Sequence, residues 1–330
     1  PLSPWITWST VHRGVTYEKH KIQNLGQDVS KQNKLYPPLW TELKNNGYKV
    51  GVYGSMHSNK MPSNISDYKF YIPDPFSDHS KCYPFKLEPI QDFQLKLARS
   101  SSRNVQRSFF KQVSLKLVLA FFKSGVRIST YIDLIKQLMH EKVDKNKVNR
   151  RRVYQSIINF DIFYSLLKST SPDFCSFFTN HVASAMHRYW EAAYPKDFDG
   201  QNKQNKEWIY SYKDEVDFAM AKVENQLNRL VKYANSRSNY EIWVCTSMGQ
   251  APVINYLPVK TQLYITNPKR FLQFLGFDDN LFEIMPAMMP RCTFKSKKEL
   301  IKELSETLQG FLLDNKKCEL MEIENSLTIK

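Results

Sequence analysis

Three short apolar segments, each followed by polar or small residues, constrain the fold of this chain most strongly. Residues 48–53, 174–179 and 240–246 are rich in β-branched and aromatic side chains, as buried strands are. Stretches with helical patterns separate the three segments. Strands that alternate with helices predict an α/β fold with a central, mostly parallel sheet flanked by helices.

The predicted strand ends carry groups that can bind a ligand. Residues 54–57 (GSMH) follow the first segment, Asn180 and His181 follow the second, and residues 247–250 (SMGQ) follow the third. In open α/β sheets the ligand lies beyond the carboxyl ends of the strands. We therefore expect one site where the three ends meet.

Helical patterns occupy most of the remaining chain. Residues 38–46 end at Gly47, a typical stop signal. Residues 213–234 form the clearest amphipathic helix, and its apolar face is predicted to hold Val216, Met220, Val223, Leu227 and Leu230. Further helices are expected at residues 104–123, 130–141, 147–169 and 297–313.

This organisation fits one domain over residues 1–330, a length that can bury a substantial core. We interpret residues 91–170 as a helical insertion and residues 251–330 as the C-terminal part of the domain. Residues 62–84 are rich in turn formers and predict an irregular loop beside the site.

The charge balance favours anionic partners. A formal net charge of +15 and a pI near 9.4 suit phosphorylated or sulfated substrates such as small-molecule or glycan esters, nucleic acid, or anionic lipid headgroups. The basic residues are scattered, so a generally basic surface explains the charge equally well. Nucleic acid is disfavoured, because most aromatic residues fall inside predicted strands and helices rather than on a stacking surface.

The five cysteines form no CxxC pair, which argues against a zinc knuckle or a redox motif. Cys175 and Cys245 lie in apolar runs, where we expect small buried side chains. The odd count and the expected burial indicate a reducing, cytoplasmic compartment.

No apolar run reaches the length of about 18 residues that spans a bilayer. Residues 113–122 (VSLKLVLAFF), flanked by Lys111 and Lys123, could lie in a membrane surface. For this segment we favour packing within the helical insertion.

Four pieces of the chain carry further information, and two lie near its start. Ser3 and Pro4 begin a predicted helical turn, Gly14 follows, and His20 comes six residues after Gly14. The second piece, residues 39–57, reads LWTELKNNGYKVGVYGSMH.

The third piece, residues 177–190, reads FFTNHVASAMHRYW, and the fourth joins the 213–234 helix to YEIWVCTSMG at residues 240–249. In order and loop lengths, over about residues 3–250, the four pieces together resemble the alkaline phosphatase superfamily. The phosphodiesterase and sulfatase branches are the most similar. The resemblance implies a nucleophile beside divalent cations, which lower its pKa and stabilise charge on the transferred group.

The resemblance also implies roles for residues in the first two pieces. Counting back from Gly14 places Pro4 at the nucleophile position, and proline cannot attack. Ser3, one residue earlier, is therefore the catalytic candidate, with Thr7 as a poorer alternative. His57 matches a histidine that contacts the transferred anion in sulfatases, and Ser55 stands where that family has a lysine. His57 and Ser55 are the candidate substrate-binding residues.

The third piece implies metal ligands, and here the chain departs from the family. His187 matches a zinc-binding histidine. The family's aspartate, four residues earlier, is Ala183 in this chain. His181 or Asn180 could substitute for it, so His181 and His187 are the candidate metal ligands.

In the fourth piece the family's metal-binding Asp-His pair is replaced by Ser247 and Met248. Neither is a strong ligand for zinc, manganese or calcium, so a site with a divalent cation and a site without metal both stay open. The family's first strand, which ends in a metal-binding aspartate, should precede Pro1. We therefore expect that the chain is a fragment or lacks that ligand.

Two functions follow from the resemblance. The first is a divergent hydrolase or transferase that acts on a phosphate or sulfate ester, with Ser3 as nucleophile. The second is a catalytically inactive relative, a pseudoenzyme, which keeps the fold and binds an anionic ligand or partner.

Overall fold

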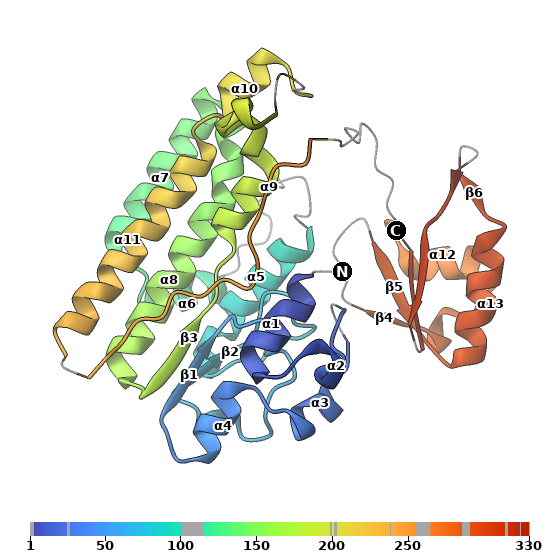
Figure 1. The fold of residues 1–330 in the computed structure, drawn as a ribbon, viewed down its shortest axis with the longest axis horizontal. Coiled ribbons are helices and arrows are strands. Elements are labelled where there is room, and N and C mark those ends of the chain that lie inside the picture. The colour runs from blue at the N-terminus through green and yellow to red at the C-terminus, as the bar shows by residue number, and fades with distance from the viewer. Residues whose placement is uncertain are drawn as a thin grey trace.

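A computed structural model describes residues 3–24, 27–100, 115–198, 200, 203–237, 239–254, 265–285, 291–313, 316–323 and 325–329. Figure 1 shows an α/β arrangement around a small parallel sheet. Its strands are β1 (Val50–Tyr53), β2 (Phe70–Ile72) and β3 (Phe174–Phe177), in the order β2-β1-β3. Both neighbours run parallel to β1. The predicted α/β class with a parallel sheet is confirmed.

Helices of the N-terminal part cover one face of the sheet. Helix α4 (Leu39–Asn45) places Trp40 against Val50 and Val52 of β1. The His12 ring of α1 (Pro4–Arg13) lies 4.8 Å from the Trp40 ring. The short helices α2 (Tyr17–His20) and α3 (Ser30–Leu35) follow α1 (Figure 1). Helix α1 is thereby held close to the carboxyl end of β1.

The other face carries the main apolar core. Phe70 and Ile72 of β2 pack with residues of α5 (Glu88–Ser100), α6 (Leu115–Lys123) and α8 (Arg151–Thr170). The approach is close at Gly51 of β1, where an added Cβ would lie 2.2 Å from Cζ of Phe70. Only glycine allows β1 and the Phe70 ring to pack this tightly.

Further helices build an outer layer. Helix α9 (His181–Ala193) packs against α10 (Lys206–Tyr212) and α11 (Glu215–Asn235). Helix α7 (Ile128–Val143) and the 3₁₀ turn Lys145–Arg150 lie along α8. Of the helix predicted at residues 104–123, the structure shows Leu115–Lys123, and residues 104–114 lie outside the described residues.

Two predictions about the sheet are wrong. Residues 62–84, predicted as a loop, contain the 3₁₀ turn Ile65–Asp67 and strand β2. Residues 240–246, predicted as a buried strand, join no strand among the described residues, and Trp243 is 81% exposed. Cys245 is exposed as well. A strand's composition shows that it can pair, and the neighbouring segments decide whether it does.

The predicted apolar face of α11 is also partly wrong. Val216 is fully buried as expected, but Met220 is 45% exposed. The buried positions of the helix include Ala219, Gln226 and Tyr233 instead. This face is rotated toward smaller and polar side chains because α9 packs closely on it.

The described residues beyond position 264 form a smaller α/β unit with its own core. Strands β4 (Glu283–Met285), β5 (Cys292–Lys295), β9 (Ser326–Ile329) and β8 (Leu320–Ile323) pair in that order as an antiparallel sheet. Helices α12 (Pro268–Phe274) and α13 (Lys298–Gln309) contribute to its core. Strands β6 (Leu312–Leu313) and β7 (Lys316–Lys317) form a two-stranded ladder.

Among the helices that the structure describes, none combines the length and the apolar character needed to cross a membrane.

Candidate functional site

A tight turn at the carboxyl end of β1 aims His57 at helix α1. Gly54 and His57 both have left-handed backbone conformations, with φ values of 72° and 62°. This conformation costs a non-glycine residue about 1 kcal/mol. At His57 it brings Nδ1 to 3.1 Å from the Ser9 Oγ on α1. Both side chains are buried, so the turn and α1 are joined by a buried hydroxyl–imidazole contact.

Arg13, the last residue of α1, is buried without a counter-charge. Its side chain is only 8% exposed, and Nη2 donates to Asn33 Oδ1 at 2.7 Å. Nε and Nη1 have no hydrogen-bond partner in the part of the chain that the structure describes, and no described carboxylate forms an ion pair with Arg13. A guanidinium carries five donors, so Arg13 holds donor capacity that these residues leave unused.

Three histidines, His12, His20 and His57, lie close enough to this guanidinium for its charge to contribute to lowering their pKa values, after burial. His20 is satisfied, because Nε2 contacts Thr10 Oγ1 at 3.0 Å and Nδ1 accepts from the Ile22 N–H at 3.0 Å. His12 Nδ1 and His57 Nε2 are shielded from solvent and have no partner among the described residues. We call Arg13, His12, His20 and His57 the basic cluster.

Aromatic rings pack against this cluster and help to shield it from water. The Trp5 ring meets the His57 ring edge-on at 6.0 Å, and the Trp8 ring stacks on the His12 ring at 5.4 Å. Such surroundings have a low effective dielectric and strengthen every charge interaction inside them.

Burial sets the charge state of the cluster. It lowers the pKa of His57 to about 3, with Arg13, His12 and His20 adding smaller repulsive contributions. Burial, followed by the Arg13 charge, lowers the pKa of His12 to about 4. The pKa of Arg13 falls to about 10, again through burial. At neutral pH the cluster therefore holds one charged guanidinium among neutral imidazoles, an arrangement that suits an anion.

Asp74 lies beyond the carboxyl end of β2, at the same edge of the sheet. It is buried, its Oδ1 accepts from the Phe76 N–H at 2.9 Å, and its N–H donates to Ser58 Oγ at 3.0 Å. Burial raises the pKa of Asp74 to about 6. Backbone groups hold this carboxyl, so it does not neutralise Arg13.

The start of α1 lies beside the segment that follows the predicted third strand. Thr7 Oγ1 donates to Met248 Sδ at 4.0 Å, and Gln250 Nε2 donates to the Ala183 carbonyl at 3.4 Å. Ser3 is the N-cap residue of α1, and its hydroxyl makes no capping hydrogen bond. All four pieces singled out in the sequence therefore have residues at this edge, although strong metal ligands are absent at Ala183 and Met248.

The two predicted metal ligands on α9 lie on different faces of the helix. His181 is buried, its Nδ1 is 2.7 Å from Thr179 Oγ1, and burial lowers its pKa to about 4. His187, six residues on, is exposed. Six residues turn an α-helix by about 240°, so the two imidazoles leave the helix in different directions. Among the described residues no group of three His, Cys, Asp or Glu side chains is placed to hold a metal.

Ser55, the other predicted substrate contact, is 2% exposed and its Oγ lies 2.7 Å from Ser176 Oγ. This contact ties the end of β1 to β3. Of the five predicted site residues, His57 is the one that lies in the basic cluster.

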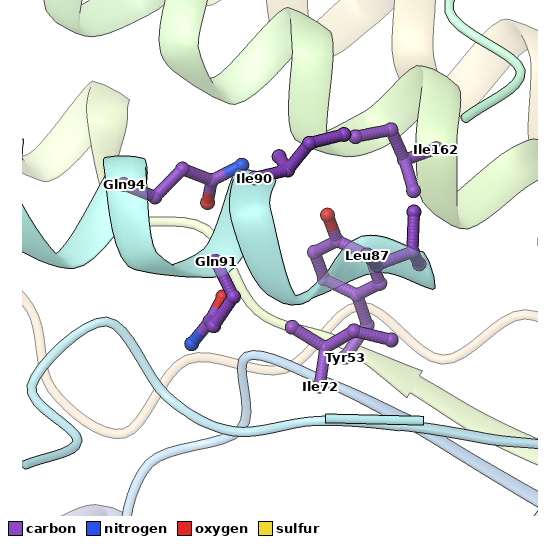
Figure 2. Close-up of a pocket in the computed structure, with 7 residues that line it drawn as sticks. All are labelled: Tyr53, Ile72, Leu87, Ile90, Gln91, Gln94 and Ile162. Carbon is purple, nitrogen blue, oxygen red and sulfur yellow. The ribbon is translucent and has the colours of Figure 1, made fainter. Parts of the chain in front are cut away.

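Two hollows described in the structure lie away from the predicted site residues. Figure 2 shows the first, a cavity of about 10 Å³ between α5 and the sheet, lined by Tyr53, Ile72, Gln91 and Gln94 among others. This volume holds about one water. The second is an open hollow of about 350 Å³ whose lining includes Lys69 and Thr170, at the amino ends of β2 and β3. Neither matches the edge where the strands end.

Sequence reasoning missed four residues of this edge: Ser9, His12, Arg13 and Asp74. Arg13 carried no signal of burial, because a basic residue at the end of a helix is usually exposed. Asp74 follows the apolar residues of β2 and would have been noticed had that strand been predicted.

Comparisons of the chain with protein-family models, with curated proteins and with solved structures found no match. The family resemblance stays a prediction.

Proposed function

We propose that the chain binds the phosphate or sulfate group of a small-molecule or glycan ester at the carboxyl edge of β1. Arg13 supplies the charge and His57 and His12 supply further hydrogen bonds. The scaffold is that of a divergent relative of the alkaline phosphatase superfamily, and the ligand is bound without metal-dependent turnover. The observation that carries this proposal is the buried Arg13 guanidinium with two unpartnered nitrogens.

The energetics of burial support an anion as the missing partner. An ion buried in a protein loses several kcal/mol of solvation, even after the structure relaxes around it. The folded protein bears this desolvation cost at Arg13, although a hydrophobic side chain at the same position would avoid it. A bound oxyanion would restore the counter-charge and accept from Nε and Nη1 in the paired geometry that guanidinium favours. Because these nitrogens are shielded, binding requires a local opening between α1 and the turn at residues 54–57.

The arrangement of the strand ends supports the family part of the proposal. Helix α1, the turn after β1 and the segment at residues 248–250 meet at one edge of a parallel sheet, where α/β proteins bind their ligands. The same edge lacks strong metal ligands at Ala183 and Met248, which favours binding over metal-dependent hydrolysis.

Sulfate is the probe that tests the proposal, because its charge does not change near neutral pH. With a millimolar dissociation constant, sulfate at tenfold excess should stabilise the folded protein by about 1.4 kcal/mol. We expect thermal unfolding to show this stabilisation in the wild type and to lose it in Arg13→Met. The control Arg270→Met removes an exposed arginine of α12 and should keep the full shift.

The outcome that contradicts the proposal is an equal sulfate shift in wild type, Arg13→Met and Arg270→Met, which would show general screening of a basic protein.

A second function, ester hydrolysis or transfer, is favoured by one contact, the Ser9–His57 pair, which has the composition of a nucleophile and its base. Turnover of an aryl phosphate or sulfate that Ser9→Ala or Ser3→Ala abolishes would establish that function instead.

A further inference from the structure

Helix α7 buries polar side chains and exposes apolar ones. Its buried residues are Thr130, Gln137 and Glu141. Thr130 Oγ1 donates to Asp161 Oδ2 at 2.5 Å, Gln137 Nε2 donates to Glu141 Oε1 at 3.0 Å, and Glu141 pairs with Arg151 at 2.6 Å. These buried polar contacts fix the rotation of the helix about its axis.

The opposite face of α7 is a row of large apolar side chains. Their exposed fractions are 78% for Ile128, 48% for Ile132, 60% for Ile135, 63% for Met139 and 88% for Val143. At 100° per residue the five positions fall within an arc of about 80°. A soluble helix normally turns such a stripe toward the core, so the burial of α7 is inverted.

Helix α6 extends this surface. Leu119 is 50% exposed and Phe122 is 75% exposed, and the Phe122 ring stacks on Tyr131 of α7 at 6.0 Å. We call Leu119, Phe122 and the five residues of α7 the apolar stripe. Single exposed apolar residues are common, whereas a continuous patch of this kind marks an interaction surface.

The charges around the stripe have one sign. The exposed charged residues from position 116 to position 145 are all basic: Lys116, Lys123, Arg127, Lys136, Lys142 and Lys145. Lys136 and Lys142 flank the stripe of α7, each about 20° beyond its edge. The acids of this stretch, Asp133, Glu141 and Asp144, are buried or half-buried.

We propose that the apolar stripe docks on the surface of an anionic lipid bilayer, with α6 and α7 lying in the plane of the interface. An interfacial helix buries apolar side chains among the acyl chains and holds lysines at its flanks against lipid phosphates. Figure 1 shows α7 at the outer side of the helical layer, and its main contacts among the described elements are with α8 and the 3₁₀ turn Lys145–Arg150. A flat partner can therefore reach it.

The charges favour a bilayer over a second copy of the chain. A two-fold contact through the stripe would set the Lys136 and Lys142 flanks of one copy against the same lysines or against further basic residues of the other. The stripe offers no exposed acid to compensate them. An anionic bilayer would both bury the isoleucines of the stripe and neutralise the lysines at its flanks.

Sedimentation of the full chain with vesicles tests this docking. We expect binding to vesicles that contain phosphatidylglycerol, weak binding to phosphatidylcholine alone, and a loss of binding as salt is raised. The double variant Ile128→Ser/Ile135→Ser should lower the partition by about tenfold or more. Lys136→Gln/Lys142→Gln should cause a similar loss on anionic vesicles only.

The matched control is Phe274→Ser on α12, which removes an apolar side chain that is also 75% exposed but lies outside the stripe. It should bind vesicles as the wild type does, and circular dichroism should show that every variant is folded. Equal loss in the control, equal binding to both vesicle types, or no binding to either would overturn the proposal. So would a dimer in sedimentation that Ile128→Ser/Ile135→Ser converts to a monomer, because a second copy would then cover the stripe.

Discussion

Buried charged groups occur in the helical layer and at the carboxyl edge of the parallel sheet, and the two regions differ in how these groups are paired. In the helical layer Asp161 lies 2.6 Å from Arg229. Glu215 of α11 accepts from Arg150 Nε at 2.9 Å and from Lys147 Nζ at 2.8 Å. At the sheet edge, Arg13 is buried to a similar depth and no described carboxylate pairs with it.

This difference separates buried charges that are paired inside the protein from the Arg13 charge, which we propose pairs with a bound anion. Each paired carboxylate of the helical layer joins two helices and is complete within the protein, which is how buried ions are normally kept. In the helical layer, each of these basic side chains is therefore paired with a buried carboxylate of the chain. At the sheet edge the buried carboxyl of Asp74 is held by backbone N–H groups, and no described carboxylate pairs with Arg13, which is where we propose that an anion binds. Removing one cation from each region tests this distinction directly.

The largest effect is expected for Arg229→Met in the helical layer. Asp161 is 1% exposed and would keep only the Thr130 hydroxyl and the Arg127 N–H as donors. A buried charge that loses its partner destabilises a protein by about 3–5 kcal/mol. Arg229 also stacks on Tyr164 at 4.5 Å, a contact that methionine replaces in part. We expect denaturant unfolding to show a loss of about 3 kcal/mol, and an unchanged midpoint would show that Asp161 does not depend on Arg229.

A second effect is expected from pH, and the buried histidines His57, His12 and His181 contribute to it. Burial lowers the pKa of His57 to about 3 and of His12 to about 4 in the folded protein, whereas both are near 6.5 when unfolded. The unfolded chain therefore binds more protons below pH 6.5. The contribution of each histidine is complete above that pH and falls by about 2 kcal/mol between pH 6.5 and 4.5. Asp74 acts in the opposite direction, because burial raises its pKa to about 6 and the folded protein takes up that proton first as the pH falls.

Denaturant unfolding at several pH values measures this slope, and His57→Gln should reduce it. The control is His140→Gln, which removes an exposed histidine of α7 that lies outside the basic cluster. Sulfate should oppose the loss, because an anion beside the cluster favours protonated imidazole. A slope that His57→Gln leaves unchanged would place the titrating groups elsewhere.

Part of the fold was predictable because local patterns carry it. Strands β1 and β3 come from apolar runs with clear polar ends, and α4 ends at Asn45, two residues before the predicted stop signal Gly47. Strand β2 has three residues in a stretch rich in turn formers, so its pattern is too short to recognise. Residues 240–246 have the composition of a strand, but no described strand pairs with them. The pattern of α7 predicts a helix, but it does not show that polar partners on α8 turn its apolar side outward.

The candidate site was predictable to a lesser extent. His57 was found because it ends a predicted strand. Arg13 matters through its burial, which depends on Trp40, on the turn after β1 and on the helices that follow α1, and none of these contacts is local in sequence. His181 and His187 are close in the chain, yet the helix that holds them directs them apart. Sequence spacing alone therefore suggested a shared metal site for His181 and His187, and it gave no sign that Arg13 belongs to the candidate site.

The smallest change in stability, and the sharpest test of the comparison, is expected for Arg13→Met. The substitution removes a buried charge together with its desolvation cost, and it loses one hydrogen bond to the half-exposed Asn33. Replacing a buried ion by an apolar side chain of similar volume is often neutral or stabilising. Without sulfate we expect a free energy of unfolding within about 1 kcal/mol of the wild type, or slightly above it. A loss as large as that of Arg229→Met would mean that Arg13 is paired inside the folded chain, and the sheet edge would then be structural like the helical layer.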